Sequence, residues 1–174
     1  MRNRIFLIGF MGSGKSTVGE KLASLTGFKY VDMDKEIEIE DDAPIREIFI
    51  KRGEHHFRNM EGSLLDKLVL ESNIVVSCGG GIILDSVNVD LLKETNSVFF
   101  LECEIETLFS RVKDDENRPF AFLDGSSESD RFIKFANLYE KRKPIYYDAA
   151  AEIIDTNGKS PEEIAQFIFE NYFI

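Results

Sequence analysis

A glycine-rich turn between an apolar run and a helical pattern constrains the fold of this chain more than any other feature. Residues 4–10 (RIFLIGF) form a continuous apolar run, which is typical of a strand buried on both faces. Residues 15–27 (KSTVGEKLASLTG) follow with helical spacing, and Gly27 stands where helices often end on glycine. A further strand is predicted at residues 28–34 (FKYVDMD), so the N-terminal part predicts one β-α-β unit.

The same alternation continues through the rest of the chain. Three more strand-like runs, NIVVSC, SVFFLEC and EIIDT, are separated by segments with helical spacing such as LLDKLVLE and IETLFSRV. Strands separated by helices predict a parallel sheet, and the continuous apolar runs place helices on both of its faces. We therefore expect an α/β fold, a three-layer sandwich with right-handed crossovers, built as a single domain over residues 1–174.

Charge and composition exclude several classes of partner. The net charge of −11 repels phosphate backbones and anionic lipids, and no basic run offsets it. No segment approaches the ~20 apolar residues that span a membrane. Cys78 and Cys103 lie in apolar runs without metal-ligand spacing, which favours buried free thiols over a disulfide or a zinc site. We expect a cytoplasmic monomer that binds neither nucleic acid nor membrane.

Two stretches do not fit the alternation of strands and helices. Residues 37–44 (IEIEDDAP) are acidic, and residues 113–130 are rich in charge, Gly and Ser. Polar loops as long as the second stretch usually act as functional lids or are disordered, so we expect a lid at about residues 113–126.

The opening turn matches a phosphate-binding pattern. Residues 9–16 (GFMGSGKS) satisfy G-x-x-x-x-G-K-[ST] between a strand and a helix, the context that this loop requires. Its glycines let backbone N–H groups converge on phosphate oxygens at a helix N-terminus. Lys15 would add positive charge near the β- and γ-phosphates, and Ser16 would ligate Mg²⁺. The predicted nucleotide-binding residues of the loop are Gly12, Ser13, Gly14, Lys15, Ser16 and Thr17.

Two carboxylates follow the second predicted strand. Asp32 and Asp34 lie at a strand end, and the carboxyl ends of parallel strands form the ligand-binding edge of such a sheet. A helix N-cap is the alternative interpretation of this pair. Beside a phosphate-binding loop, we favour a functional role for both acids.

Taken in order, the remaining motifs resemble those of shikimate kinases, a family of P-loop small-molecule kinases. They are F-R-x-x-E with Phe57, Arg58 and Glu61, the turn CGGG at 78–81, Arg118-Pro119, and R-x-P-x-Y beginning at Arg142. Each motif is short, but their order and spacing cover nearly the whole chain. The resemblance implies a five-stranded parallel sheet of the nucleoside monophosphate kinase type. It also implies ATP-dependent phosphorylation of the 3-hydroxyl of shikimate, a step towards chorismate and the aromatic amino acids.

The resemblance also implies roles for individual residues. Lys15 and the loop amides would hold the phosphates of ATP, Ser16 and Asp32 would serve Mg²⁺, and Arg118 would be a lid arginine over ATP. A helical segment at about residues 33–62 would bind the acceptor. The residues expected to contact shikimate are Asp34, Arg58, Gly80 and Arg142, and those expected to act in catalysis are Lys15, Asp34 and Arg118.

The chemistry of these side chains agrees with a hydroxy-acid substrate. Arg58 and Arg142 offer planar forks for a carboxylate, and Asp34 can accept hydrogen bonds from alcohols. We expect Glu61 to fix Arg58, because residues three apart share one face of a helix. A gluconate-type kinase or a nucleoside monophosphate kinase is the alternative. A GTPase is excluded because the chain has no N-K-x-D motif.

Overall fold

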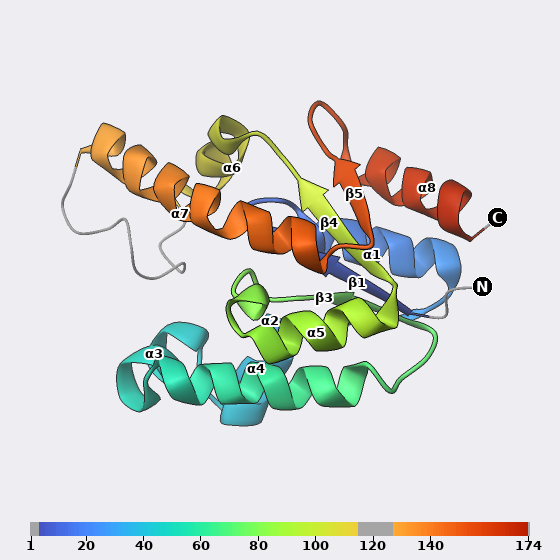
Figure 1. The fold of residues 1–174 in the computed structure, drawn as a ribbon, viewed down its shortest axis with the longest axis horizontal. Coiled ribbons are helices and arrows are strands. Elements are labelled where there is room, and N and C mark those ends of the chain that lie inside the picture. Colours follow the sequence, from blue (N-terminus) through green and yellow to red (C-terminus); the bar gives the residue numbers. More distant parts are fainter. Residues whose placement is uncertain (1–3, 115–126, 174) are drawn as a thin grey trace.

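The computed structural model describes residues 4–114 and 127–173, in which strands and helices alternate along the chain (Figure 1). The strands are β1 (Arg4–Ile8), β2 (Lys29–Asp32), β3 (Ile74–Ser77), β4 (Val98–Glu102) and β5 (Glu152–Asp155). The helices are α1 (Lys15–Thr26), α2 (Met33–Asp41), α3 (Ile45–Arg52), α4 (Glu54–Leu68), α5 (Ser86–Thr95), α6 (Ile105–Val112), α7 (Glu128–Ala149) and α8 (Pro161–Tyr172). A short 3-10 helix, η1 (Ile82–Leu84), precedes α5.

The five strands form one parallel sheet in the order β2-β3-β1-β4-β5. The predicted five-stranded parallel sheet is confirmed. All carboxyl ends meet at one edge, and the connections on the two sides of the central β1 run in opposite directions. Such a switch point is where open α/β sheets bind ligands, and the loop after β1 lies there.

Side chains of β1 alternate between two apolar cores on opposite faces of the sheet. Phe6 and Ile8 belong to the core that also receives side chains from α2, α4, α5, α6 and α7. Ile5 and Leu7 belong to the core under α1 and α8. Figure 1 shows α8 beside α1 and α7 beside α5, in agreement with their contacts. The continuous apolar runs of the sequence therefore reflect burial on both faces, as predicted.

The second strand is shorter than the sequence predicts. Residues 28–34 were expected to be extended, but β2 ends at Asp32 and α2 begins at Met33. The cause is local, because an Asp32 oxygen accepts hydrogen bonds from the backbone N–H groups of Asp34 and Lys35. The helix N-cap interpretation of Asp32 is therefore correct as a description of its local structure.

The acidic stretch at residues 37–44 is mostly helical, which corrects the expectation that it lies outside the alternation. Helix α2 continues to Asp41, with Ile37 fully buried; Glu36 and Glu40 are exposed, whereas Asp34, Glu38 and Asp41 are half-buried. Asp42 adopts a left-handed conformation with φ of 51° and ends the helix.

Two further expectations concern membranes and cysteines. Within residues 4–114 and 127–173, no helix is both long and apolar enough to cross a bilayer. Cys78 and Cys103 are buried free thiols, as predicted.

Candidate active site

The loop between β1 and α1 has the backbone geometry of an anion-binding turn. Gly12 and Gly14 have φ values of 84° and 86°, which glycine adopts without strain. Gly14 is the N-cap residue of α1, and none of the described side chains caps this helix end. The first N–H groups of α1 thus lie at the loop, where helix polarity favours an anion.

Lys15 lies across this loop. Its Nζ donates to the carbonyl oxygens of Gly9 at 2.8 Å and Phe10 at 3.2 Å. The ammonium group is therefore held at the loop itself, beside the end of α1. Ser13 is buried beneath the loop, whereas Ser16 and Thr17 are exposed on the first turn of α1.

Asp32 joins β2, α1 and α2 at the sheet edge. Its Oδ2 accepts a hydrogen bond from the Ser16 hydroxyl at 2.8 Å and another from the Tyr30 hydroxyl at 3.2 Å. Its Oδ1 faces the start of α2, as described above. Burial is the main cause that raises the pKa of Tyr30 to about 12, so this phenol keeps its proton at neutral pH.

The glycine turn after β3 lies against the acceptor side chains predicted from the sequence. A Cβ atom on Gly79 would fall 2.6 Å from Glu61 Oε1 and 2.8 Å from Asp34 Oδ1. A Cβ atom on Gly81 would fall 2.7 Å from Arg58 Nη2. Side chains at these two positions would displace the charged groups, which explains why the turn consists of glycine.

Gly80, between them, reaches the phosphate loop. A Cβ atom there would lie 3.6 Å from the Gly9 oxygen and 3.7 Å from the Met11 nitrogen, which is ordinary contact distance. Its own carbonyl accepts hydrogen bonds from Arg142 Nη1 at 3.3 Å and from the Tyr146 hydroxyl at 2.6 Å. The turn therefore brings Asp34, Arg58, Gly80 and Arg142 to one place beside the phosphate loop.

The two predicted acceptor arginines are held by aromatic rings and by different partners. Arg58 forms ion pairs with Glu54 and Glu61, and its guanidinium lies 5.2 Å from the ring centroid of Phe57. Arg142 lies 5.8 Å from the ring centroid of Phe10. Its Nε is buried and has no hydrogen-bond partner among the described residues, so it retains a donor for an anion.

Glu61 is a buried carboxyl group at the centre of this cluster. Burial raises its pKa to about 7, and the charge of Arg58 opposes that shift. Its Oε2 pairs with Arg58, whereas its buried Oε1 has no hydrogen-bond partner within the described part of the chain. The expected contact between Glu61 and Arg58 is present.

Three positioning residues escaped the sequence analysis. Tyr146 holds the Gly80 carbonyl and is completely buried. Arg111 donates from Nη1 to the Gly12 oxygen at 2.9 Å and so ties α6 to the phosphate loop. Tyr30 holds Asp32. The partners of Tyr146 and Arg111 are distant in sequence, and Tyr30 meets Asp32 only because alternate residues of a strand share one face. Tyr146 alone of the three belongs to a motif found in the sequence, R-x-P-x-Y.

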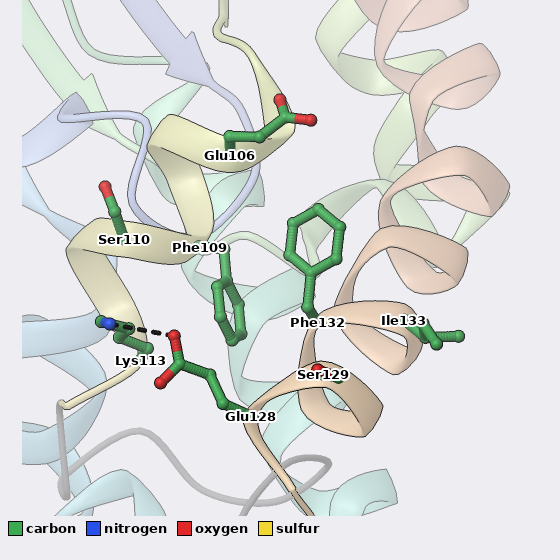
Figure 2. Close-up of a pocket in the computed structure, with 8 residues that line it drawn as sticks. All are labelled: Glu106, Phe109, Ser110, Lys113, Glu128, Ser129, Phe132 and Ile133. Atoms are coloured by element: carbon green, nitrogen blue, oxygen red, sulfur yellow. Dashed lines mark hydrogen bonds and ion pairs between the residues drawn. The ribbon is translucent and has the colours of Figure 1, made fainter.

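Arg118 and nearly all of the predicted lid at about residues 113–126 lie outside the described residues. Near the ends of that segment, residues of α6 and α7 line an open pocket of about 600 Å³ (Figure 2). Phe109 and Phe132 line it, and Lys113 pairs with Glu128 at its edge at 3.0 Å. Among the described residues, none of the predicted nucleotide-binding or acceptor-binding side chains lines this pocket.

Comparison with known proteins decides among the kinase families. A sequence model described as shikimate kinase matches residues 11–172. The chain belongs to the shikimate kinase family. The shikimate kinase of Persephonella marina is 46% identical over 169 residues, which cover 97% of each chain.

Solved structures agree with this assignment. A shikimate kinase from Acinetobacter baumannii in complex with shikimate superimposes with a TM-score of 0.88 at 35% identity, covering 99% of this chain and 96% of that one. A gluconokinase from Sinorhizobium meliloti reaches a TM-score of 0.57 at 18% identity, covering 95% of this chain and 88% of that one, which shows a shared fold alone. The predicted membership of the shikimate kinases is confirmed, and the gluconate-type and nucleoside monophosphate kinase alternatives are not favoured.

Proposed function

We propose that the chain transfers the γ-phosphoryl group of ATP to the 3-hydroxyl of shikimate. The observation that carries this proposal is the contact made by the turn at residues 78–81. A Cβ atom on Gly80 would lie 3.6 to 3.7 Å from atoms of the phosphate loop, and Cβ atoms on Gly79 and Gly81 would overlap Asp34 and Arg58. A donor nucleotide on the loop and an acceptor on these side chains would therefore meet at the turn, as transfer between them requires.

The acceptor would bind through its carboxylate and its hydroxyl groups. Arg58 and Arg142 can bind a carboxylate in two-point geometry, and the buried Nε of Arg142 supplies a donor that no described residue uses. Asp34 and Glu61 both lie at Gly79, because a Cβ atom there would fall 2.8 Å from Asp34 Oδ1 and 2.6 Å from Glu61 Oε1. The Asp34 carboxylate would accept hydrogen bonds from ring hydroxyls and thereby select a polyhydroxylated acid over an apolar one.

The nucleotide would bind through the loop and the start of α1. Backbone N–H groups at residues 12–17 and the Lys15 ammonium group supply positive potential for the β- and γ-phosphates. By family resemblance, Arg118 would cover the nucleotide from the lid and exclude water, which limits wasteful hydrolysis.

The residues at the start of α1 and at the end of β2 fit a magnesium ion. Ser16 and Asp32 offer hard oxygen donors 2.8 Å apart, the ligand type that Mg²⁺ prefers. Within the described residues, no group of three or more His, Cys, Asp or Glu side chains could hold a metal, so a cage made of protein alone is not the arrangement there. Mg²⁺ carried by the nucleotide would supply neutralisation of phosphate charge.

Asp34 is the residue we assign to the chemical step. An alcohol is a weak nucleophile at neutral pH, and a carboxylate beside it can accept its proton as the bond to phosphorus forms. Lys15 would stabilise the charge on the transferring phosphoryl group. We also propose a cytoplasmic location, in agreement with the two free thiols, and a monomeric state.

An acceptor panel tests the proposal. ADP release is measured with ATP and Mg²⁺ in the presence of shikimate, gluconate or CMP, and the product is identified by phosphorus and proton NMR. We expect turnover with shikimate alone and a phosphate on its 3-oxygen. Turnover with gluconate or CMP at a comparable kcat/KM, or a phosphate on another oxygen, would overturn the assignment.

A further inference from the structure

Tyr30 occupies a position that neither the motifs nor the family assignment explain. It is the second residue of β2, and Asp32 is the last. Side chains two apart on a strand lie on the same face, so the Tyr30 ring runs along the sheet towards the Asp32 carboxylate. Its hydroxyl donates to Asp32 Oδ2 at 3.2 Å. Tyr30 thus forms a hydrogen bond with the carboxylate that we propose as a ligand of Mg²⁺.

The Asp32 carboxylate is fixed from three elements. Oδ1 accepts from the backbone N–H of Asp34 at 3.1 Å, at the start of α2. Oδ2 accepts from Ser16 on α1 at 2.8 Å and from Tyr30 on β2 at 3.2 Å. Of the two hydroxyls on Oδ2, Ser16 is itself an expected metal ligand, whereas Tyr30 is not. Tyr30 therefore contacts Oδ2 from β2 without being an expected metal ligand itself.

A second observation shows that the chain is built to admit this ring. Gly19 lies three residues after Ser16 on the same face of α1, and a Cβ atom there would fall 2.6 Å from Tyr30 Cε2 and 3.4 Å from Cδ2. Glycine destabilises the interior of a helix, so its presence there usually has a packing reason such as the close approach of another group. Gly19 supplies that approach, because the Tyr30 ring packs directly on the helix backbone below Ser16.

We propose that Tyr30 is a positioning residue for the magnesium site, orienting the Asp32 carboxylate so that the metal-dependent part of nucleotide binding is strong. The proposal rests on the metal role of Asp32 given above. Removing the phenol oxygen leaves ring packing on Gly19 intact but frees Asp32 Oδ2 on one side. Groups that orient metal ligands commonly contribute about 10-fold or more to metal affinity.

The test compares Tyr30→Phe with the parent protein by isothermal titration calorimetry. Binding of the non-hydrolysable ATP analogue AMP-PNP is measured with saturating Mg²⁺ and again in EDTA. We expect Tyr30→Phe to lower affinity by about 10-fold with Mg²⁺ and to leave affinity in EDTA unchanged. Unchanged affinity in EDTA also shows that the variant is folded.

A matched control is available elsewhere in the chain. The Tyr172 hydroxyl donates to Glu152 Oε2 at 3.1 Å, another part-buried tyrosine on a carboxylate, but at the amino-terminal end of β5. Tyr172→Phe should leave both affinities unchanged. The proposal is overturned if Tyr30→Phe retains the parental effect of Mg²⁺, or if it weakens binding equally with and without Mg²⁺, which is a packing effect.

Asp32→Asn is titrated in parallel. It distinguishes failure of the proposal about Tyr30 from failure of the proposal that Asp32 binds Mg²⁺. If Asp32→Asn loses the effect of Mg²⁺ and Tyr30→Phe keeps it, Asp32 serves the metal without help from Tyr30. If both variants keep the effect of Mg²⁺, the metal role of Asp32 itself is wrong. We predict that the effect of Mg²⁺ is reduced in Tyr30→Phe and lost in Asp32→Asn, and that it is unaffected in the Tyr172 control.

Discussion

Arg58 and Glu61 form an ion pair on α4 in which the carboxylate is almost fully buried and the guanidinium remains partly accessible. The pair therefore presents its positive member to the acceptor side of the sheet edge. Glu61 and Asp34 also both lie at Gly79, so one buried acid is paired with the arginine proposed to bind the acceptor and is near the proposed base. The protonation state of Glu61 therefore affects both Arg58 and Asp34.

We predict that Glu61→Gln flattens the pH dependence of stability. The pKa of Glu61 is raised from 4.5 to about 7, so between these values the folded protein holds a proton that the unfolded chain has lost. Raising the pH through this window therefore lowers the free energy of unfolding, by an amount on the order of 2 kcal/mol. Urea unfolding of parent and variant from pH 5 to pH 8 measures this change. A parental slope retained in Glu61→Gln would contradict it.

The acceptor arginines give a prediction about substrate binding. Arg58→Ala or Arg142→Ala should reduce kcat/KM for shikimate, which corresponds to a loss of about 2–5 kcal/mol of transition-state stabilisation. The reason is that each substitution leaves the carboxylate of the substrate without one of its charged partners. The KM for ATP should change far less. Lys93→Ala, which removes an exposed cation paired with Asp148, is the control and should leave both constants unchanged. Weakened ATP binding with unaltered shikimate binding would place these arginines in the other subsite.

Tyr146→Phe should show how much the Tyr146 hydroxyl stabilises the glycine turn. The variant removes the hydrogen bond to the Gly80 oxygen at 2.6 Å without changing ring packing. We expect a loss of about 1–2 kcal/mol in the free energy of unfolding and a raised KM for shikimate. Tyr147→Phe, whose hydroxyl donates to Glu102 in an exposed position, is the neighbouring control. Equal behaviour of the two variants would show that Tyr146 has no special role at the turn.

Lys15→Met should abolish turnover by orders of magnitude and preserve the fold. The substitution keeps side-chain length and removes a charge held against the loop carbonyls of Gly9 and Phe10. Circular dichroism checks the fold, and a coupled assay of ADP release measures turnover. Lys35→Met, which removes an exposed cation paired with Glu20, should retain parental turnover. Near-parental turnover in Lys15→Met would remove this lysine from the mechanism.

The sequence predicted the sheet well because its signals are local and strong. The three central strands, β1, β3 and β4, are continuous apolar runs that are buried on both faces of the sheet, whereas the edge strands β2 and β5 are partly exposed. The glycine loop is equally local, since its pattern occupies eight consecutive residues. The end of β2 was wrong because a single side chain, Asp32, caps α2 and stops the strand earlier than the apolar pattern suggests.

The sequence predicted only those residues of the candidate site that belong to a short motif. Asp34, Arg58, Gly80 and Arg142 lie together, and each belongs to a short motif. Tyr30 and Arg111 were missed because their partners, Asp32 and the Gly12 carbonyl, become neighbours only through strand alternation and the packing of α6. A glycine inside a helix, at Gly19, was the one sequence signal that could have drawn attention to Tyr30.

The roles proposed for Asp32 and Asp34 predict different responses to Mg²⁺. Asp32 contacts Ser16 at the phosphate loop, so Asp32→Asn should be partly restored by raising the Mg²⁺ concentration. Asp34 contacts the acceptor turn instead, so Asp34→Asn should not respond to Mg²⁺. Steady-state kinetics over a Mg²⁺ series measures both. Restoration of Asp34→Asn rather than Asp32→Asn would reverse the two roles.

The kcat of Asp34→Asn at saturating ATP, shikimate and Mg²⁺ tests the central claim most directly. Asparagine keeps the size of the side chain and one acceptor oxygen but removes its basicity, so the acceptor can still bind while its proton has no base. We predict a kcat reduced by about 10²–10⁴-fold with a KM for shikimate close to that of the parent. A kcat within a few-fold of the parent, with a raised KM, would show that Asp34 orients the hydroxyl groups and does not accept the proton.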